Sequence, residues 1–200
     1  MRNFKRFLSL VMATLMILSV AVITTGAADT TADYTDAAQH LVALKIMKGD
    51  NGNLMLDQGV TRYQAALFFV QTVSGETDTA VWNAQKTSAN FKDVVEYGTA
   101  IDYAYGRKLV VGRGNGVFGY NDPITYQDML VLAVRALGYE TEDMSYPYGY
   151  ILAAQKLELT KDVAKTVNYT AALTRGETAQ IMWNMLNTEI AAEDPISGKL

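Results

Sequence analysis

Apolar residues recur at helical spacing after three similar short stretches of the chain. These stretches are "TRYQ" from Thr61, "TYQD" from Thr125 and "TRGE" from Thr174. The apolar positions that follow are Ala66, Leu67, Val70 and Val73 in the first copy, Met129, Leu132, Val134 and Leu137 in the second, and Ala179, Met182, Met185 and Leu186 in the third. Because side chains three and four residues apart share one face of a helix, each stretch is predicted to begin an amphipathic helix.

Each of these predicted helices begins with a capping pattern. Gln64, Asp128 and Glu177 stand three residues after the threonine of their copy. In a capping box the threonine hydroxyl accepts a hydrogen bond from the third backbone N–H, and the third side chain reaches back to the threonine N–H. Asp128 has the shortest side chain and is the poorest match. Helix initiation is therefore sufficient to explain the three threonines.

The similarity between the copies extends upstream of the threonines. "LKIMKGDNGNLMLDQGVTRY" begins at Leu44 and "RKLVVGRGNGVFGYNDPITY" begins at Arg107, and a helical pattern precedes each. The third copy has "YPYGYILAAQKLEL" as its first helix, but its loop has lost the glycines. One unit of about 40 residues cannot bury both of its helices, so tandem units must pack against each other. We predict an all-α fold of three tandem helix-loop-helix repeats.

The N-terminal segment has the character of a secretory signal peptide. "MRNFKR" is basic, a long run without charge follows, and the small residues of "GAADT" offer a cleavage site after Ala27 or Ala28. The alternative is a retained membrane anchor, since the apolar run is long enough to span a bilayer. Once the segment is removed, we expect no membrane association.

The predicted boundaries follow from the signal peptide and the repeats. The polar residues after Ile190 show no further pattern and suggest a linker to a downstream region. The segments are a signal peptide at 1–27, repeats at 28–73, 91–138 and 147–190, linkers at 74–90 and 139–146, and the final linker at 191–200.

Composition narrows the class of protein. The chain has a net charge of −4, and residues 1–27 hold three basic and no acidic residues. The segment after the signal peptide is therefore more acidic still and has no basic stripe, which argues against nucleic acid as a partner. There is no cysteine, so disulfides and thiolate metal sites are excluded. A secreted domain of this size without cysteine is typical of bacterial surfaces.

Arg62 and Arg175 occupy the first helical position of their copies, where the fold does not require a cation. A positive charge there opposes the helix dipole, so its recurrence suggests an anionic partner. A guanidinium can hold a carboxylate by two parallel hydrogen bonds, and the free N–H groups of the helix start add to such a site. The alternatives are a solvated arginine or an intramolecular pair, such as Arg175 with Glu177. The middle copy has Tyr126 at this position.

These features together resemble the S-layer homology domain of bacterial cell-surface proteins. The family pattern has an aromatic-x-Asp start, a helix, a glycine-containing loop and a Thr-Arg-x-Glu motif that leads a second helix. The second repeat matches with "FKDV", "AIDYAYGRKLVVG" and "GNGVFGYNDPIT", the first with "YTDAAQHLVALKIMKGDNGNLMLDQGVTRYQAA" and the third with "ALTRGETAQIMWNML". The resemblance covers about residues 30–190.

The resemblance implies a pseudo-threefold helical domain that attaches non-covalently to a secondary cell-wall polysaccharide, often one with pyruvate ketals. It also implies that the motif arginines, together with loop residues of a neighbouring repeat, form grooves for the sugar acid. Carried over to this chain, these ligand-binding positions are Arg62 and Arg175, with Gln64 and Glu177 at the acidic position of the motif. The groove that contains Tyr126 is then incomplete, and at most two arginine-based grooves are expected.

The two glycine-rich loops suggest turns rather than ligand sites. "GDNG" lacks the alternating ligands of a calcium loop, and "GRGNG" is neither preceded by a buried strand nor followed at once by a helix. Both are predicted to be turns with positive φ. Lys48, Asp50 and Arg113, which lie beside these turns, could still face a groove.

Catalytic and metal-binding patterns are weak. His40 lies mid-helix without a second histidine, which favours a helix-surface or interface role over metal binding. Trp183 lies at helical spacing, which favours the core. No catalytic triad or paired carboxylates stand out, so no enzyme activity and no cofactor are expected within these residues. The alternative to wall binding is a structural role through contacts with other surface-layer subunits. A catalytic region, if the protein has one, would lie beyond Leu200.

Overall fold

The computed structural model describes residues 32–84, 89–163 and 168–192, and these segments confirm an all-α fold. Extended segments pair only as isolated β-bridges in the described residues. The predicted signal peptide and most of the predicted final linker lie outside these segments. Within them, no helix is long and apolar enough to cross a membrane. The helices are α2 (Thr35–Ala43), α3 (Arg62–Ser74), α4 (Thr79–Trp82), α5 (Gly98–Gly106), α6 (Tyr126–Ala136), α7 (Tyr148–Lys156) and α8 (Arg175–Leu186).

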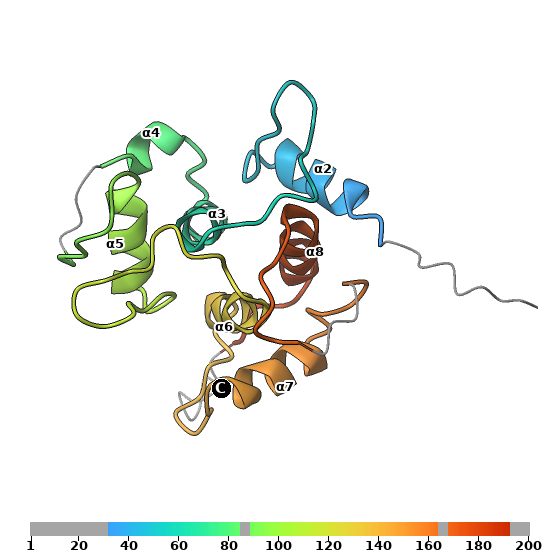
Figure 1. Cartoon of the computed structure of the whole chain (residues 1–200). Helices are drawn as coiled ribbons and strands as arrows, with labels where there is room; N and C mark the ends of the chain where they lie inside the picture. The colour runs from blue at the N-terminus through green and yellow to red at the C-terminus, as the bar shows by residue number, and fades with distance from the viewer. Residues whose placement is uncertain (1–31, 85–88, 164–167, 193–200) are drawn as a thin grey trace, which may run out of the picture. The chain divides into compact units, whose positions relative to one another are not determined.

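The second helices of the three repeats, α3, α6 and α8, lie side by side at the centre and are seen nearly end-on in Figure 1. The first helices surround them. The α5 helix packs on α3, α7 packs on α6, and α2 packs on α8. Each first helix therefore packs against the second helix of the preceding repeat, and α2 completes the circle on the last one. This arrangement is the expected pseudo-threefold packing.

A closed set of three backbone hydrogen bonds lies where the repeats meet. The amide N–H of Val60 donates to the carbonyl of Leu173 (3.1 Å), that of Leu173 to Ile124 (3.0 Å), and that of Ile124 to Val60 (2.8 Å). Each of these residues directly precedes the capping threonine of its copy, and none is more than 2% exposed. The three bonds satisfy the backbone N–H and C=O of three buried residues, as a buried backbone requires.

The predicted caps begin all three central helices. Thr61 and Thr174 form complete capping boxes with Gln64 and Glu177. The hydroxyl of Thr125 accepts from the backbone N–H of the residue three positions on, but the reciprocal bond of a capping box is not made. The predicted weakness of the middle cap is therefore confirmed.

Apolar faces of the helices in the described residues build one continuous core. Val70, Met129 and Met182 of the central helices are completely buried, as their helical spacing predicts. At the end of α8, Leu186 is 37% exposed because the helix stops there. The segment predicted to be a linker at 74–90 contains α4, whose Trp82 is buried edge-on against Tyr103.

The glycine-rich loops adopt the predicted positive φ values. Asn51 and Gly52 have φ of 47° and 82° in the first repeat. Gly114, Asn115 and Gly116 have φ of 91°, 52° and 71° in the second. These left-handed conformations, which glycine and asparagine tolerate best, reverse the chain between the first helix and the extended segment.

Gly176, at the start of α8, allows the N-terminal aromatic residue of the first repeat to approach closely. A Cβ atom at this position would lie 2.5 Å from Cδ2 of Tyr34, the residue that precedes α2. We expect Gly176→Ala to reduce the free energy of unfolding by about 1–3 kcal/mol, as overpacking usually does.

Chemical denaturation would measure this effect. Gly106→Ala is the matched control, because a Cβ atom at Gly106 meets nothing within 4 Å. It should leave stability unchanged or raise it slightly, since alanine favours a helix over glycine. Equal stability of the two variants would contradict the proposed contact.

Candidate functional site: three grooves

Arg62 reaches from the start of α3 into the loop of the second repeat. Its Nε donates to the carbonyl of Phe118 (3.2 Å) and its Nη2 to the carbonyl of Val111 (2.9 Å). The guanidinium also lies 5.1 Å from the centre of the Phe118 ring, a cation–π distance. Only 8% of the residue is exposed. The arginine therefore ties the first repeat to the second.

Arg175 makes the equivalent connection from the third repeat to the first. Its Nε donates to the carbonyl of Leu54 (3.1 Å) and its Nη2 to that of Lys48 (2.9 Å). The residue is 7% exposed, and burial lowers the pKa of its guanidinium. Arginine nonetheless stays protonated in proteins, so a positive charge is held inside the domain. The alternative pair with Glu177 is not formed, because that carboxylate accepts from the backbone of Thr174.

These contacts change the interpretation of the motif arginines. The sequence indicated that folding does not explain a cation at the first helical position. In the structure both guanidiniums fasten a loop of the next repeat, so each has a structural role as well. Their partners lie 49 to 127 residues away in sequence, where local pattern analysis cannot find them.

The first groove, here the Arg62 groove, lies between α6 and the loop of the second repeat and has a volume of about 420 Å³. Every arginine that lines it is paired with a carboxylate. Asp128 lies 3.4 Å from Nη1 of Arg62 and 3.6 Å from Nη2 of Arg113. Arg113 also pairs with Asp122 (3.4 Å), and Arg135 pairs with Glu140 (3.0 Å).

The hydroxyl of Tyr146 donates to the second oxygen of Asp128 at 2.8 Å. This carboxylate is therefore held from three sides, by Arg62, Arg113 and Tyr146. The contacts explain why Asp128 does not complete the cap of α6: its side chain turns to the groove. The charges of the Arg62 groove are compensated within the protein itself.

The second groove, here the Arg175 groove, occupies the equivalent place between α3 and the loop of the first repeat. Its volume is about 190 Å³, and Lys48, Gln64, Gln71 and Arg175 contribute its polar lining. The amino group of Lys48 is 3.5 Å from the hydroxyl of Thr79. Among the described residues, neither of its two cations has a carboxylate within ion-pair distance.

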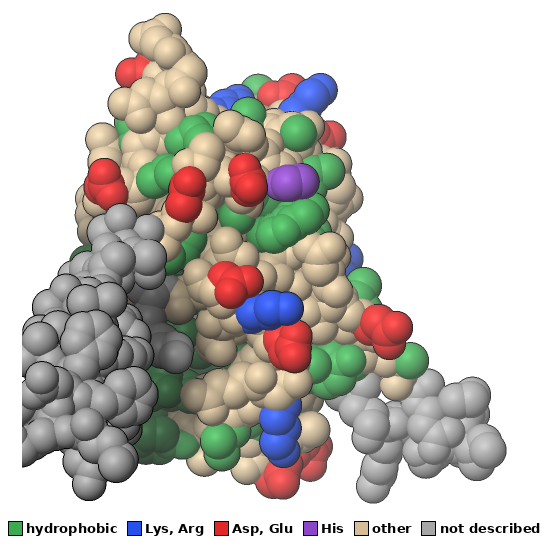
Figure 2. Space-filling view, turned by 90° about the vertical axis from the view of Figure 1, so that its right-hand side faces the viewer, with side chains coloured by type: hydrophobic (Ala, Val, Ile, Leu, Met, Phe, Trp, Pro, Cys, Tyr) green, Lys and Arg blue, Asp and Glu red, His purple; other side chains and the backbone are tan. Residues whose placement is uncertain are grey.

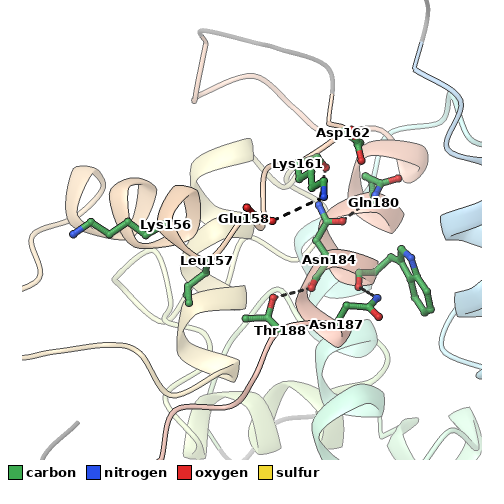
Figure 3. A pocket seen from close by; sticks show the side chains of 10 residues that line it. Lys156, Leu157, Glu158, Lys161, Asp162, Gln180, Asn184, Asn187 and Thr188 are labelled. Atoms are coloured by element: carbon green, nitrogen blue, oxygen red, sulfur yellow. Dashed lines mark hydrogen bonds and ion pairs between the residues drawn. The ribbon is translucent and has the colours of Figure 1, made fainter.

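The third groove, here the Asn184 groove, lies between α8 and the loop of the third repeat and has a volume of about 530 Å³ (Figure 3). The amide nitrogen of Asn184 donates to the carbonyls of Leu159 (3.0 Å) and Lys161 (2.7 Å). Asn184 therefore fastens this loop in place of an arginine. Glu158 and Lys161 form an ion pair of 4.0 Å at its edge.

The face of the domain seen in Figure 2 has mixed charge. Acidic and basic side chains are interspersed in Figure 2, beside the single histidine of the chain. His40 is exposed on α2 and stacks on Trp183 of α8 with ring centres 4.0 Å apart. This position agrees with the predicted helix-surface or interface role of the histidine. The tryptophan, which was expected in the core, is only half-buried, at the junction of the first and third repeats.

Tyr126 replaces the motif arginine in the middle copy and contributes to none of the three grooves. Its ring packs 5.7 Å from that of Tyr169 and only 5% of the residue is exposed. Burial raises the pKa of its hydroxyl to about 12, so the side chain is neutral at physiological pH. Two grooves thus contain one motif arginine each, and the Asn184 groove contains none.

The other predicted ligand-binding residues divide into two sets. Lys48 and Gln64 line the Arg175 groove, and Arg113 lines the Arg62 groove. Glu177 is used by the cap of α8, and Asp50 bonds to the side chain of Asn51; neither lines one of the three grooves. Sequence reasoning missed Asp128, Gln71 and Asn184. For Asp128 the sequence did contain an indication of another role, because an aspartate side chain is short for a capping box.

Comparison with known proteins identifies the middle part of the chain. Residues 90–130 match the family model of the S-layer homology domain. These residues form an S-layer homology domain.

Three relatives share most of the chain. The chain is 34% identical over 194 residues to a cell surface protein of Thermoanaerobacter kivui. The alignment covers 91% of the chain and 24% of that relative. The chain is 26% identical over 196 residues to a middle cell wall protein of Brevibacillus brevis (93% and 18%) and 26% identical over 167 residues to a surface layer protein of Brevibacillus choshinensis (80% and 15%). The chain thus spans about a quarter or less of the length of these curated relatives.

Asp93 shapes the loop that the S-layer homology domain presents to Arg62. Its carboxylate accepts hydrogen bonds of 2.8 Å from the backbone N–H groups of Phe118, Gly119 and Tyr120. Phe91-Lys92-Asp93 lies ahead of α5, whereas Thr35 already begins α2, so the two aromatic-x-Asp triplets are not at equivalent positions. This contact holds in place the carbonyl of Phe118, one of the two acceptors of Arg62.

The protonation of Asp93 is expected to affect stability. Burial raises the pKa of its carboxyl, but the three backbone hydrogen bonds outweigh burial and the pKa lies below the ordinary value. A lowered pKa means that the carboxylate stabilises the fold at neutral pH and that this contribution is lost on acidification below about pH 4. Asp93→Ala should reduce the free energy of unfolding by about 1–3 kcal/mol at pH 7.

Denaturation as a function of pH would measure this contribution. The difference between the parent and Asp93→Ala should shrink as the pH falls, because the parent loses the same carboxylate contacts by protonation. Asp57→Ala, at an exposed carboxylate of the first repeat, should change stability by less than about 0.5 kcal/mol. A difference for Asp93 that stays constant down to pH 2 would contradict the role of its charge.

Proposed function

We propose that this chain is an anchoring module that binds a secondary cell-wall polysaccharide non-covalently and tethers a secreted protein to the bacterial surface. Two grooves at corresponding positions between repeats each contain a buried motif guanidinium, and this observation carries the proposal. The names of the three relatives, a cell surface, a cell wall and a surface layer protein, support a location at the cell surface.

The chemistry of these grooves suits an acidic sugar. Guanidinium and ammonium groups bind carboxylates by charge-assisted hydrogen bonds, which are about twice as strong as neutral ones. Tyr63 and Tyr97 line the Arg175 groove, and a tyrosine side chain combines apolar contact surface with a hydroxyl group that can bond to a sugar. A pyruvate ketal on the polymer would supply the carboxylate.

Binding to purified peptidoglycan that carries its wall polymer tests the proposal. The double variant Arg62→Gln with Arg175→Gln should lose at least about tenfold in affinity, the effect of one or more charge-assisted hydrogen bonds. Because both arginines also fasten loops, circular dichroism must establish that the variant is folded. Lys48→Gln, an exposed cation of the Arg175 groove, should weaken binding without affecting the fold.

Two outcomes would contradict the proposal. One is a parent domain that binds stripped peptidoglycan as well as peptidoglycan with its polymer. The other is a folded double variant with the affinity of the parent.

A role in assembly through protein–protein contacts is the second candidate, favoured by the exposed apolar side chains on and beside α7. Tyr146, Tyr148 and Leu152 are 57%, 70% and 58% exposed. Sedimentation over a range of concentrations, without glycan, would reveal self-association. Under this second proposal the double change Tyr148→Ser with Leu152→Ser should shift the molecule toward the monomer. A parent that stays monomeric at high concentration would argue against it.

A further inference from the structure

The two motif arginines differ at one nitrogen. Both use Nε and Nη2 to hold two carbonyls of the neighbouring loop. In Arg62 the remaining nitrogen, Nη1, donates to Asp128 at 3.4 Å. In Arg175 the remaining nitrogen has no hydrogen-bond partner among the described residues. The Nη1 atom therefore donates to a carboxylate in the Arg62 groove, and the corresponding atom of Arg175 has no such partner among the described residues.

The difference depends on the residue three positions after the capping threonine, which is equivalent in the two repeats. Asp128 is the third residue of α6 and Gln64 is the third residue of α3. Asp128 turns into its groove, whereas the amide oxygen of Gln64 accepts from the backbone N–H of Thr61 at 3.0 Å and completes the cap. A neutral cap in one repeat and an acid in the other thus set the charge of the two grooves.

Two further features of the Arg175 groove indicate space for a ligand. Lys48 adds a second cation, and its only described side-chain partner is a hydroxyl group. Gln71 is 98% buried and lines the groove, yet its Oε1 accepts no hydrogen bond from the described residues. A buried polar atom without a protein partner is unusual in a folded protein, and an ordered water or a ligand group usually fills this role.

The electrostatics agree with this contrast. Burial alone accounts for the lowered pKa of Arg175, which has no carboxylate to offset it. For Arg62, burial and the nearby Arg113 lower the pKa, while Asp128 and Asp122 act in the opposite direction. The cations of the Arg175 groove therefore lack a paired carboxylate among the described residues, whereas those of the Arg62 groove are all paired.

We infer that the two arginine grooves are not equivalent: the Arg175 groove is the primary site for a carboxylate of the wall polymer, and Asp128 acts in the Arg62 groove as a built-in substitute for that carboxylate. This inference rests on the proposed function. A ligand carboxylate binds Nη1 of Arg175 with Lys48 as a second donor, and Gln71 accepts from a sugar hydroxyl. In the Arg62 groove the same ligand must first displace the Asp128 carboxylate from Nη1 of Arg62. Its own carboxylate is then repelled by the negative charge of Asp128.

Reciprocal substitutions test the inference without removing either arginine. Gln64→Asp places an acid in the Arg175 groove, and Asp128→Asn removes the acid from the Arg62 groove. Binding is measured on immobilised wall polymer, native and after chemical reduction of its carboxyl groups. We expect Gln64→Asp to lower affinity for the native polymer about tenfold and Asp128→Asn to raise it, with no effect of either on the reduced polymer.

Single arginine variants provide the second comparison. Arg175→Gln should lose about tenfold in affinity, and Arg62→Gln should lose less than about threefold. Arg107→Gln removes a cation from an exposed position outside all three grooves and is the control for net charge. Thermal unfolding of each variant separates loss of binding from loss of structure.

The possible results distinguish the two proposals. Failure of the parent to bind the polymer overturns the proposed function and this inference with it. Binding by the parent with equal losses in Arg62→Gln and Arg175→Gln, or with no gain in Asp128→Asn, overturns the inference alone. Equal binding of native and reduced polymer overturns the assignment of a carboxylate.

Discussion

The closed set of backbone hydrogen bonds among Val60, Ile124 and Leu173 is the constraint on which the domain depends. Each of these residues precedes a helix start, so the three bonds fix where α3, α6 and α8 begin relative to one another. The motif position directly after each cap is then placed at the edge of the next repeat. The Arg62 and Arg175 grooves therefore arise from the way the repeats are joined, because each combines residues of more than one repeat. The residues that line the Asn184 groove all belong to the third repeat.

A buried cation is the second consequence of this geometry. Arg62 and Arg175 lose most of their hydration and recover hydrogen bonds from loop carbonyls, which satisfy two of their three nitrogens. Burying a charge is unfavourable unless it is paired, and the two grooves meet this requirement differently. One supplies a carboxylate from its own helix. The other has no carboxylate paired with the charge, and the proposed binding of an anion would supply that partner.

Local sequence was sufficient for the fold but only partly for the grooves. The capping threonines, the helical periodicity and the positive-φ turns at Asn51 and Asn115 are determined by neighbouring residues, and they were predictable for that reason. The partners of Arg175 lie 121 and 127 residues away in sequence, in the first repeat, where it packs against the third. The short side chain of Asp128 predicts a weak cap, but its contact with Arg62 depends on how two repeats dock. The charge balance of each groove required the structure.

The packing of α2 on α8 has a consequence for the evolution of the domain. In an open array of repeats, units can be gained or lost at the ends because each contacts only its neighbours. Here the first helix of every unit is covered by the preceding unit, and the circle is complete after the third. Copy number is thus fixed by geometry. The triplet, rather than the single repeat, is the smallest part that natural recombination or protein engineering can transfer as a whole.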